Sequence, residues 1–314
     1  MAALQDHVLA SDIAARMAAW QPQVPAITPD MVPVPQELWG SAFEIETDAG
    51  NVTIKLDAVS GGVAGLLLPA FPGVELADHD HQLGVLVYSV LNASDYARVQ
   101  NCELCYLKGF PASAEPPSSS TRAQLTGLWR SDSGTQAPFT LLLQLDFPFD
   151  LVALFGAPSS VWISLEIGSQ ADVRWDVQLF GKGATRYSEG IYLEWLPLAP
   201  FLDGRWLMDK LGSWIDPLDV VVNGAQQQHA VKSGVVYRNP AAATHGLFIE
   251  TTDAAVVCVN TEKNPYTLLP MITEPLTGPV TGFASLLYTN AWAMNYPLWS
   301  LDESMRFRFR VTST

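Results

Sequence analysis

Hydrophobic residues follow two different patterns along the chain, and the change falls near residue 38. In the N-terminal segment they recur at three- and four-residue spacing, which is typical of one face of an amphipathic helix. This apolar stripe is formed by Val8, Leu9, Ile13, Met17 and Trp20. We therefore predict an N-terminal helix within residues 1–20, although a helix can also begin at Ser11 or Asp12. Such a helix must pack on the main domain or belong to a segment upstream of it.

A proline-rich segment separates this helix from the rest of the chain. Five prolines fall within residues 21–38, and proline does not continue a helix. The segment is therefore predicted to be an extended connector.

From residue 39 onward, apolar and polar residues alternate in short runs that are typical of β-strands. Residues 43–47 and 52–56 alternate on both sides of an Asp-Ala-Gly-Asn turn, which predicts a β-hairpin. Residues 305–311 alternate arginine with phenylalanine or valine, as a strand with one buried face does. A glycine-rich turn is predicted at residues 61–65. Further strands are predicted at residues 83–90, 105–110, 141–145, 161–167, 173–180, 190–195, 219–223, 235–238, 246–250, 254–259 and 283–289.

So many strands without intervening helices predict an all-β fold. Glycine and proline number 22 each and fall mostly between the strand runs. We therefore predict a large antiparallel β-sandwich over residues 39–314. A β-propeller is less favoured, because the sequence shows no repeat of fixed period.

Composition narrows the class of protein. Hydrophobic residues make up 48% of the chain and charged residues 16%, which excludes disorder as the main state. The net charge of −15 disfavours nucleic acid and anionic membranes as partners. The sequence begins with neither a signal peptide nor an apolar run of membrane-spanning length. We expect a soluble, cytoplasmic protein, and a fragment of a longer precursor would look the same.

Cofactor and metal motifs are weak. Cys102 and Cys105 have redox or zinc spacing, but a zinc ribbon needs a second cysteine pair, so ordinary thiols are favoured. His79 and His81 form a His-x-His pair that can bind zinc on a strand, although the polar surroundings favour a solvated loop. No phosphate-binding loop, dinucleotide fingerprint or nucleophile elbow is present. We therefore predict neither a cofactor nor a metal.

The segment 214–230 gives the clearest indication of ligand binding. The predicted strand 219–223 ends in Asn-Gly, and three glutamines and His229 follow. Amide side chains such as that of Gln228 both donate and accept hydrogen bonds, which suits sugar hydroxyls, and His229 can act as a general base. Asp216 belongs to the same segment. The alternative is a polar turn whose glutamines bond the loop backbone.

Two other groups of residues are candidates for sugar contact. Arg186 and Glu189 can project into a cleft, where a carboxylate near Tyr187, Tyr192 and Trp195 can act as an acid; the alternative is a cross-strand salt bridge. Sugar faces stack on aromatic rings, and the chain has ten tryptophans, most of which must be core. The best stacking candidates lie in polar surroundings, and they are Trp206, Trp292 and Trp299.

Several motifs from residue 141 onward resemble a known family. They are LFGKGATRYSE at 179–189, DKLG at 209–212, DPLDVVVNG at 216–224, TDAAVVC at 252–258 and NAWAMNYP at 290–297. Together they resemble the C-terminal β half of a poorly characterised family of fungi and bacteria that is similar to glycoside hydrolase family 38, the α-mannosidase-like enzymes. The resemblance implies a galactose mutarotase-like supersandwich. It also implies a partner, because the zinc-bearing barrel of family 38 has no counterpart in this sequence.

Three functions follow as hypotheses. The first is a β-sandwich half or subunit of a family 38-like glycoside hydrolase, which contributes carbohydrate-contacting loops and needs a separate catalytic-domain chain. The second is a free-standing carbohydrate-binding module. The third is a mutarotase-like sugar isomerase, with His229 as proton shuttle and Glu189 as base. In all three the partner is a carbohydrate, and the expected contacts are Arg186, Asp216, Gln228, His229 and Trp292.

Overall fold

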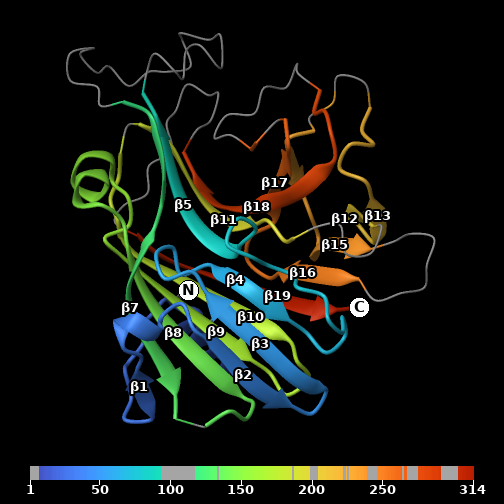
Figure 1. Ribbon diagram of the computed structural model, residues 1–314. Coiled ribbons are helices and arrows are strands. Elements are labelled where there is room, and N and C mark those ends of the chain that lie inside the picture. Colours follow the sequence, from blue (N-terminus) through green and yellow to red (C-terminus); the bar gives the residue numbers. More distant parts are fainter. Residues whose placement is uncertain are drawn as a thin grey trace.

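The structure is a computed structural model that describes residues 7–92, 117–132, 134–185, 187–198, 204–221, 224, 226–238, 246–263, 265–266, 275–290 and 303–314. Within them the chain forms two antiparallel sheets, which Figure 1 shows as two layers. The all-β sandwich predicted from the strand pattern is therefore confirmed. No helix in the described part of the chain is long and apolar enough to cross a membrane.

Sheet A has the strand order β1-β7-β8-β9-β10-β19-β16-β15-β12-β13. Its strands are β1 (Met31–Pro33), β7 (Gln124–Ser131), β8 (Phe139–Asp146), β9 (Ser160–Ile167), β10 (Val173–Lys182), β19 (Glu303–Ser313), β16 (Leu247–Thr251), β15 (Gly234–Arg238), β12 (Arg205–Lys210) and β13 (Ser213–Ile215). The chain leaves and re-enters sheet A several times. Neighbouring strands of this sheet therefore come from distant parts of the sequence.

Sheet B has the order β14-β17-β18-β11-β5-β4-β3-β2, and β6 pairs with β5. Its strands are β14 (Gln228–Ala230), β17 (Val256–Thr261), β18 (Val280–Thr289), β11 (Ser188–Trp195), β5 (Leu83–Leu91), β4 (Val63–Leu67), β3 (Gly50–Leu56), β2 (Ala42–Thr47) and β6 (Ser119–Arg122). The predicted hairpin is present, because β2 pairs with β3 across the expected turn.

Two local predictions were wrong. Residues 219–221, the described part of the strand expected at 219–223, are not in a strand. Asp216 and Pro217 begin a turn instead, in which the Asp219 N–H donates to the Asp216 carbonyl at 3.0 Å. The turn expected at residues 61–65 contains the start of β4, because Gly61 and Gly62 end the turn and Val63 already pairs with Leu83 of β5. The strand expected at 105–110 lies outside the described residues.

The main core lies between the sheets and follows from the period of two along each strand. On β11, Ile191, Leu193 and Trp195 point into this core, and Trp195 packs edge-on against Trp175 of β10 with ring centroids 5.2 Å apart. Tyr192 points the other way, into a smaller apolar cluster on the opposite face of sheet B. The central strand β11 is therefore covered on both faces.

Helix α1 (Ala10–Trp20) confirms the N-terminal helix but does not bury its apolar stripe. Val8 is 87% exposed and Trp20 59%, so this stripe does not pack on the main domain, which was one of the two alternatives. Polar contacts hold only the end of the helix: Arg306 donates to the Ala19 carbonyl at 2.9 Å, and the Gln23 N–H donates to the Gln178 side chain at 2.8 Å. The outer face of sheet A that meets the helix is polar, which explains why the stripe is not covered there.

Candidate functional site

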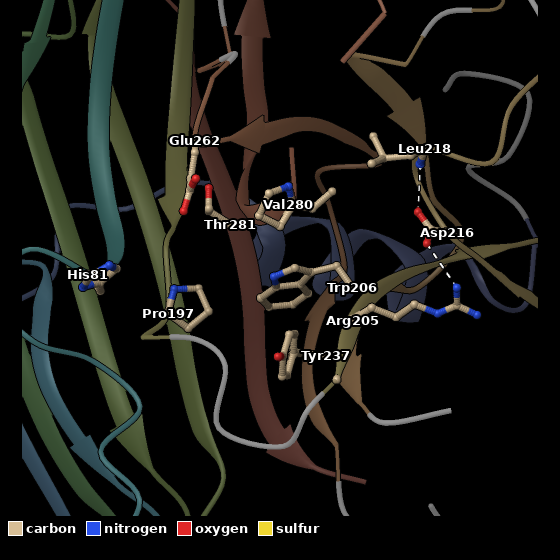
Figure 2. Close-up of a pocket in the computed structure, with 12 residues that line it drawn as sticks. His81, Pro197, Arg205, Trp206, Asp216, Leu218, Tyr237, Glu262, Val280 and Thr281 are labelled. Carbon is tan, nitrogen blue, oxygen red and sulfur yellow. Dashed lines mark hydrogen bonds and ion pairs between the residues drawn. The ribbon is translucent and has the colours of Figure 1, made fainter. Parts of the chain in front are cut away.

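A cavity of about 390 Å³ lies where β12, β15 and β18 meet the segments that follow β11 and β17. We call it the Trp206 cavity, and Figure 2 shows the side chains that line it. Its aromatic residues are Trp206 and Tyr237, and its polar side chains are His81, Arg205, Asp216, Glu262 and Thr281. An apolar, aromatic surface with a few convergent polar groups is the usual composition of a small-molecule site.

The aromatic side of the cavity is built by strand pairing. Trp206 on β12 lies directly opposite Tyr237 on β15, and the two rings pack edge-to-face with centroids 5.3 Å apart. Phe283 of β18 also packs edge-to-face against Trp206, with ring centroids 5.2 Å apart. These contacts leave Trp206 only 3% exposed. The expectation that Trp206 is an exposed stacking platform was therefore wrong, because its ring faces are covered.

Trp206 instead contributes its indole N–H. The Nε1 atom is buried and has no hydrogen-bond partner in the described part of the chain. Figure 2 shows the ring nitrogen on the side that faces Pro197 and Thr281, across the cavity. A buried donor left without an acceptor costs about 1–3 kcal/mol, so a bound acceptor at this position would recover that free energy.

His81 stands at one side of the cavity in a fixed orientation. Its Nδ1 lies 2.9 Å from Asp78 Oδ1, and its backbone N–H donates to the same oxygen at 2.7 Å. Burial alone would raise the pKa of Asp78, but these hydrogen bonds hold it below the ordinary value, so the carboxylate is ionised. An ionised carboxylate only accepts, so Nδ1 carries the proton and Nε2 is the acceptor of the neutral ring.

Arg205 and Asp216 form an ion pair at the opposite side, with Nη1 and Oδ2 3.4 Å apart. The Leu218 N–H donates to the second oxygen of Asp216 at 2.9 Å, which fixes the carboxylate within its turn. Of the expected contacts that the structure describes, Asp216 lines the cavity, whereas Gln228 and His229 do not. Glu262 lies beside Thr281 on the wall between His81 and Trp206 (Figure 2).

Gln228 and His229 lie on the edge strand β14 and do not line the Trp206 cavity. The His229 ring is buried, with Nε2 3.0 Å from the Gln226 carbonyl, and burial lowers its pKa from the ordinary 6.5. Gln228 bonds the buried Cys258 thiol of β17, whose pKa burial raises to about 12 despite that bond. Both side chains are engaged with the protein.

Glu189 occupies the interior of the sandwich. Its carboxylate accepts from Lys182 Nζ at 2.7 Å and from the Tyr88 hydroxyl at 2.6 Å, and Lys182 and Glu189 are both 0% exposed. Burial first, and then the Glu189 charge, raise the pKa of Tyr88 far above its ordinary value. This placement differs from the expected cleft, because β11 turns residue 189 toward the core. Arg186, Trp292, Trp299, Cys102 and Cys105 lie outside the described residues.

A second cavity, of about 550 Å³, lies on the other face of sheet B and was not expected from the sequence. Glu194 of β11 lines it and accepts from the Tyr266 hydroxyl at 2.7 Å and from Arg122 at 3.2 Å. Asn260 also lines this cavity and donates to Thr281 of the Trp206 cavity at 2.8 Å, so the two cavities are neighbours. Side chains alternate between the two faces of β11, so the sequence already indicates that Glu194 and Glu189 lie on opposite faces of this strand.

The His-x-His segment does not assemble a metal site. His79 faces Asp57 at 3.4 Å while His81 faces Asp78, so the two rings have different partners. Among the residues that the structure describes, no group of three or more histidine, cysteine, aspartate or glutamate side chains is placed to hold a metal ion.

Comparisons with known proteins give structural neighbours only. No protein-family model matches the sequence, and no curated protein sequence matches it. Similar solved structures include the Slr1438 protein of Synechocystis sp. PCC 6803, at 10% identity and a TM-score of 0.42 over 93% of this chain and 99% of that one. The resemblance to glycoside hydrolase family 38 is supported by none of these findings.

Two further structures carry names of sugar epimerases. A putative aldose 1-epimerase of Escherichia coli K12 matches at 9% identity and a TM-score of 0.41, over 87% of this chain and 99% of that one. The galactose 1-epimerase of Lactobacillus acidophilus NCFM matches at 10% identity and a TM-score of 0.42, over 86% of this chain and 93% of that one.

Proposed function

We propose that the protein binds a carbohydrate in the Trp206 cavity. The observation that carries this proposal is the buried indole N–H of Trp206, which has no acceptor among the described residues and faces the cavity. Around it lie two hydroxyls, an imidazole, two carboxylates and a guanidinium. A sugar presents both apolar C–H surface and hydroxyl groups that donate and accept, which matches this mixture of aromatic and polar groups.

The test is calorimetric titration with a panel of simple hexoses and pentoses. Trp206→Phe keeps an aromatic ring and removes the N–H, and we expect it to weaken binding by about tenfold. Trp39→Phe is the matched control, because Trp39 donates its N–H to the Val34 carbonyl at 2.9 Å and does not line the cavity. If no sugar binds, or if Trp206→Phe binds as tightly as wild type, the proposal fails.

A second candidate function is exchange of sugar anomers. One observation favours it: the imidazole of His81 and the carboxylate of Glu262 line the same cavity. Opening a hexose ring needs one group to remove the C1 hydroxyl proton and another to protonate the ring oxygen, and these two groups have suitable chemistry. They replace His229 and Glu189, which are engaged in the protein interior.

Polarimetry tests this candidate directly. A freshly dissolved α-hexose should reach its equilibrium rotation faster with the protein present, and His81→Asn and Glu262→Gln should each remove that acceleration. A catalytic group typically contributes at least about a hundredfold in rate, so a mere halving would contradict the assignment. His229→Asn serves as the comparison, and we expect it to exchange anomers as wild type does.

The family 38-like β half remains a proposal that depends on a partner chain. The exposed apolar stripe of α1 favours it, since a contiguous apolar surface commonly marks a protein contact. Native mass spectrometry of the protein from its own source tests it. A complex with a second chain would support the proposal, whereas the 34.2 kDa chain alone, or copies of it, would contradict it.

A further inference from the structure

A third cavity lies on the far side of the Arg205–Asp216 ion pair. Its volume is about 660 Å³, and the charged residues that line it are Arg205, Asp216, Asp219 and Arg238. We call it the Arg238 cavity. Arg205 and Arg238 point to the face of sheet A opposite Trp206 and Tyr237. The two cavities nevertheless share Arg205, Asp216 and Leu218, so they meet where β12 begins and β15 ends.

Strand pairing places two arginines side by side in the Arg238 cavity. Arg205 on β12 is the direct partner of Arg238 on the antiparallel strand β15, so both side chains are on the same face. Like charges directly opposite each other destabilise a sheet. A negative charge next to the two guanidinium groups would offset this repulsion.

Among the described residues, the carboxylates that line the cavity neutralise the two arginines only in part. Asp216 contacts Arg205 only at the long distance of 3.4 Å, and the Arg205 side chain remains 58% exposed. Among the described residues, no ion pair joins Arg238 to a carboxylate or Asp219 to either arginine. The buried Nε of Arg238 also has no hydrogen-bond partner in that part of the chain.

The guanidinium of Arg238 is nevertheless held in place. It lies over the ring of Trp214 on β13, with its central carbon 5.4 Å from the ring centroid. Trp214 in turn packs edge-on against Phe248 of β16 at 5.8 Å. Stacking on an aromatic face fixes the plane of the guanidinium and leaves its N–H edge free to bind a planar or tetrahedral oxyanion.

We propose that the Arg238 cavity binds the oxyanion of an acidic sugar, either a carboxylate or a phosphate group, whose ring occupies the Trp206 cavity. The two arginines would then share one anion, which removes their mutual repulsion and uses the fork geometry of Arg238. This inference rests on the proposed carbohydrate binding and narrows its substrate class from sugars in general to anionic sugars.

The experiment is calorimetric titration with four probes: glucose, glucuronate, glucose 6-phosphate and inorganic phosphate. We expect at least one anionic sugar to bind about tenfold more tightly than glucose, the size of a charge-assisted hydrogen bond. Comparison of the two anionic sugars distinguishes a carboxylate from a phosphate.

Variants of Arg238 assign the effect. Arg238→Gln should remove the preference for the anion and leave the affinity for glucose unchanged, because Arg238 does not line the Trp206 cavity. Arg238→Lys keeps the charge without the fork and should retain only part of the preference, and it also serves where the glutamine variant folds poorly. Arg16→Gln on the exposed helix α1 makes the same charge change and should alter nothing.

The outcomes separate this inference from the proposed function. If glucose binds but neither anionic sugar binds more tightly, the carbohydrate site stands and the oxyanion site is refuted. The oxyanion site is equally refuted if the preference for the anion survives in Arg238→Gln. If phosphate binds in an Arg238-dependent manner and no sugar binds, carbohydrate binding is refuted, and with it the assignment of the anion to a sugar, although an anion site at Arg238 is present. If no probe binds, both are refuted.

Discussion

Removal of the Glu189 charge tests whether this residue stabilises the fold or serves a reaction. Glu189→Gln keeps the side-chain shape and leaves Lys182 charged in an interior position that is 0% exposed. Breaking one partner of a buried ion pair costs about 3–5 kcal/mol, because the remaining charge has lost its counter-charge and has no water around it. We therefore expect the free energy of unfolding to fall by about that amount.

The chain offers a matched control on its surface. Glu166 and Arg174 are also 2.7 Å apart, but their side chains are 41% and 50% exposed. Glu166→Gln should cost no more than about 1 kcal/mol, since solvent screens an exposed pair. The two variants thus differ in burial and not in the distance between the charges.

Urea unfolding followed by circular dichroism measures both variants, and a double-mutant cycle completes the test. Lys182→Met combined with Glu189→Leu should lose less stability than the two single changes added together, because no charge is left unpaired. The reasoning is refuted if Glu189→Gln costs no more than Glu166→Gln. A fully stable Glu189→Gln protein that has lost sugar turnover would restore Glu189 as a catalytic group.

Three further outcomes follow from the described residues. Because burial lowers the pKa of His229 in the folded protein, its neutral form stabilises the fold above pH 6.5, and this contribution is lost as the pH falls through the folded-state pKa. Urea titrations at about pH 7 and about pH 5 should show a smaller loss for His229→Gln than for wild type. Gly84→Ala should cost about 2–5 kcal/mol, as its φ is +72° and a Cβ would meet the Trp175 ring nitrogen at 2.4 Å. Gly73→Ala, with a φ of +71° and open space around it, should cost about 1 kcal/mol, and thermal denaturation measures both glycine variants. Deletion of residues 1–20 should change the free energy of unfolding by less than about 1.5 kcal/mol, because the helix contributes a hydrogen bond to Arg306 and little buried apolar surface.

Much of the fold could be predicted because half-buried strands carry a clear period of two. The hairpin at residues 43–56 and the strand at 305–311 each alternate through their full length, and both are present. Residues 219–221, the described part of the strand expected at 219–223, do not form a strand, for a physical reason. Its run of valines has high β-propensity, but Asp216 and Pro217 fix a turn whose bonds occupy the backbone that a sheet would need.

The Trp206 cavity could not be read from any local motif. His81, Trp206, Tyr237, Glu262 and Thr281 come from five separate segments, and the crossovers of both sheets bring them together. The sequence predicted Asp216 as a sugar contact, Trp206 as a stacking platform and His81 as a possible zinc ligand, but nothing in it indicated that these residues line one cavity. The buried indole N–H of Trp206 has no sequence signature, because it depends on which groups the folded chain leaves without a partner.

The two glutamates of β11 show that the predicted site depends on which face of the sheet each strand residue points to. Glu189 and Glu194 are both flanked by aromatic residues, and the sequence alone gives them similar standing. They are five positions apart, an odd number, so a regular strand must turn them to opposite faces. Glu189 therefore neutralises Lys182 inside the sandwich, while Glu194 faces a cavity and meets Tyr266 and Arg122. An interior carboxylate needs a counter-charge, whereas a carboxylate that lines a cavity can contact a ligand. The face of the sheet to which each glutamate points therefore decides which of the two belongs to a candidate site.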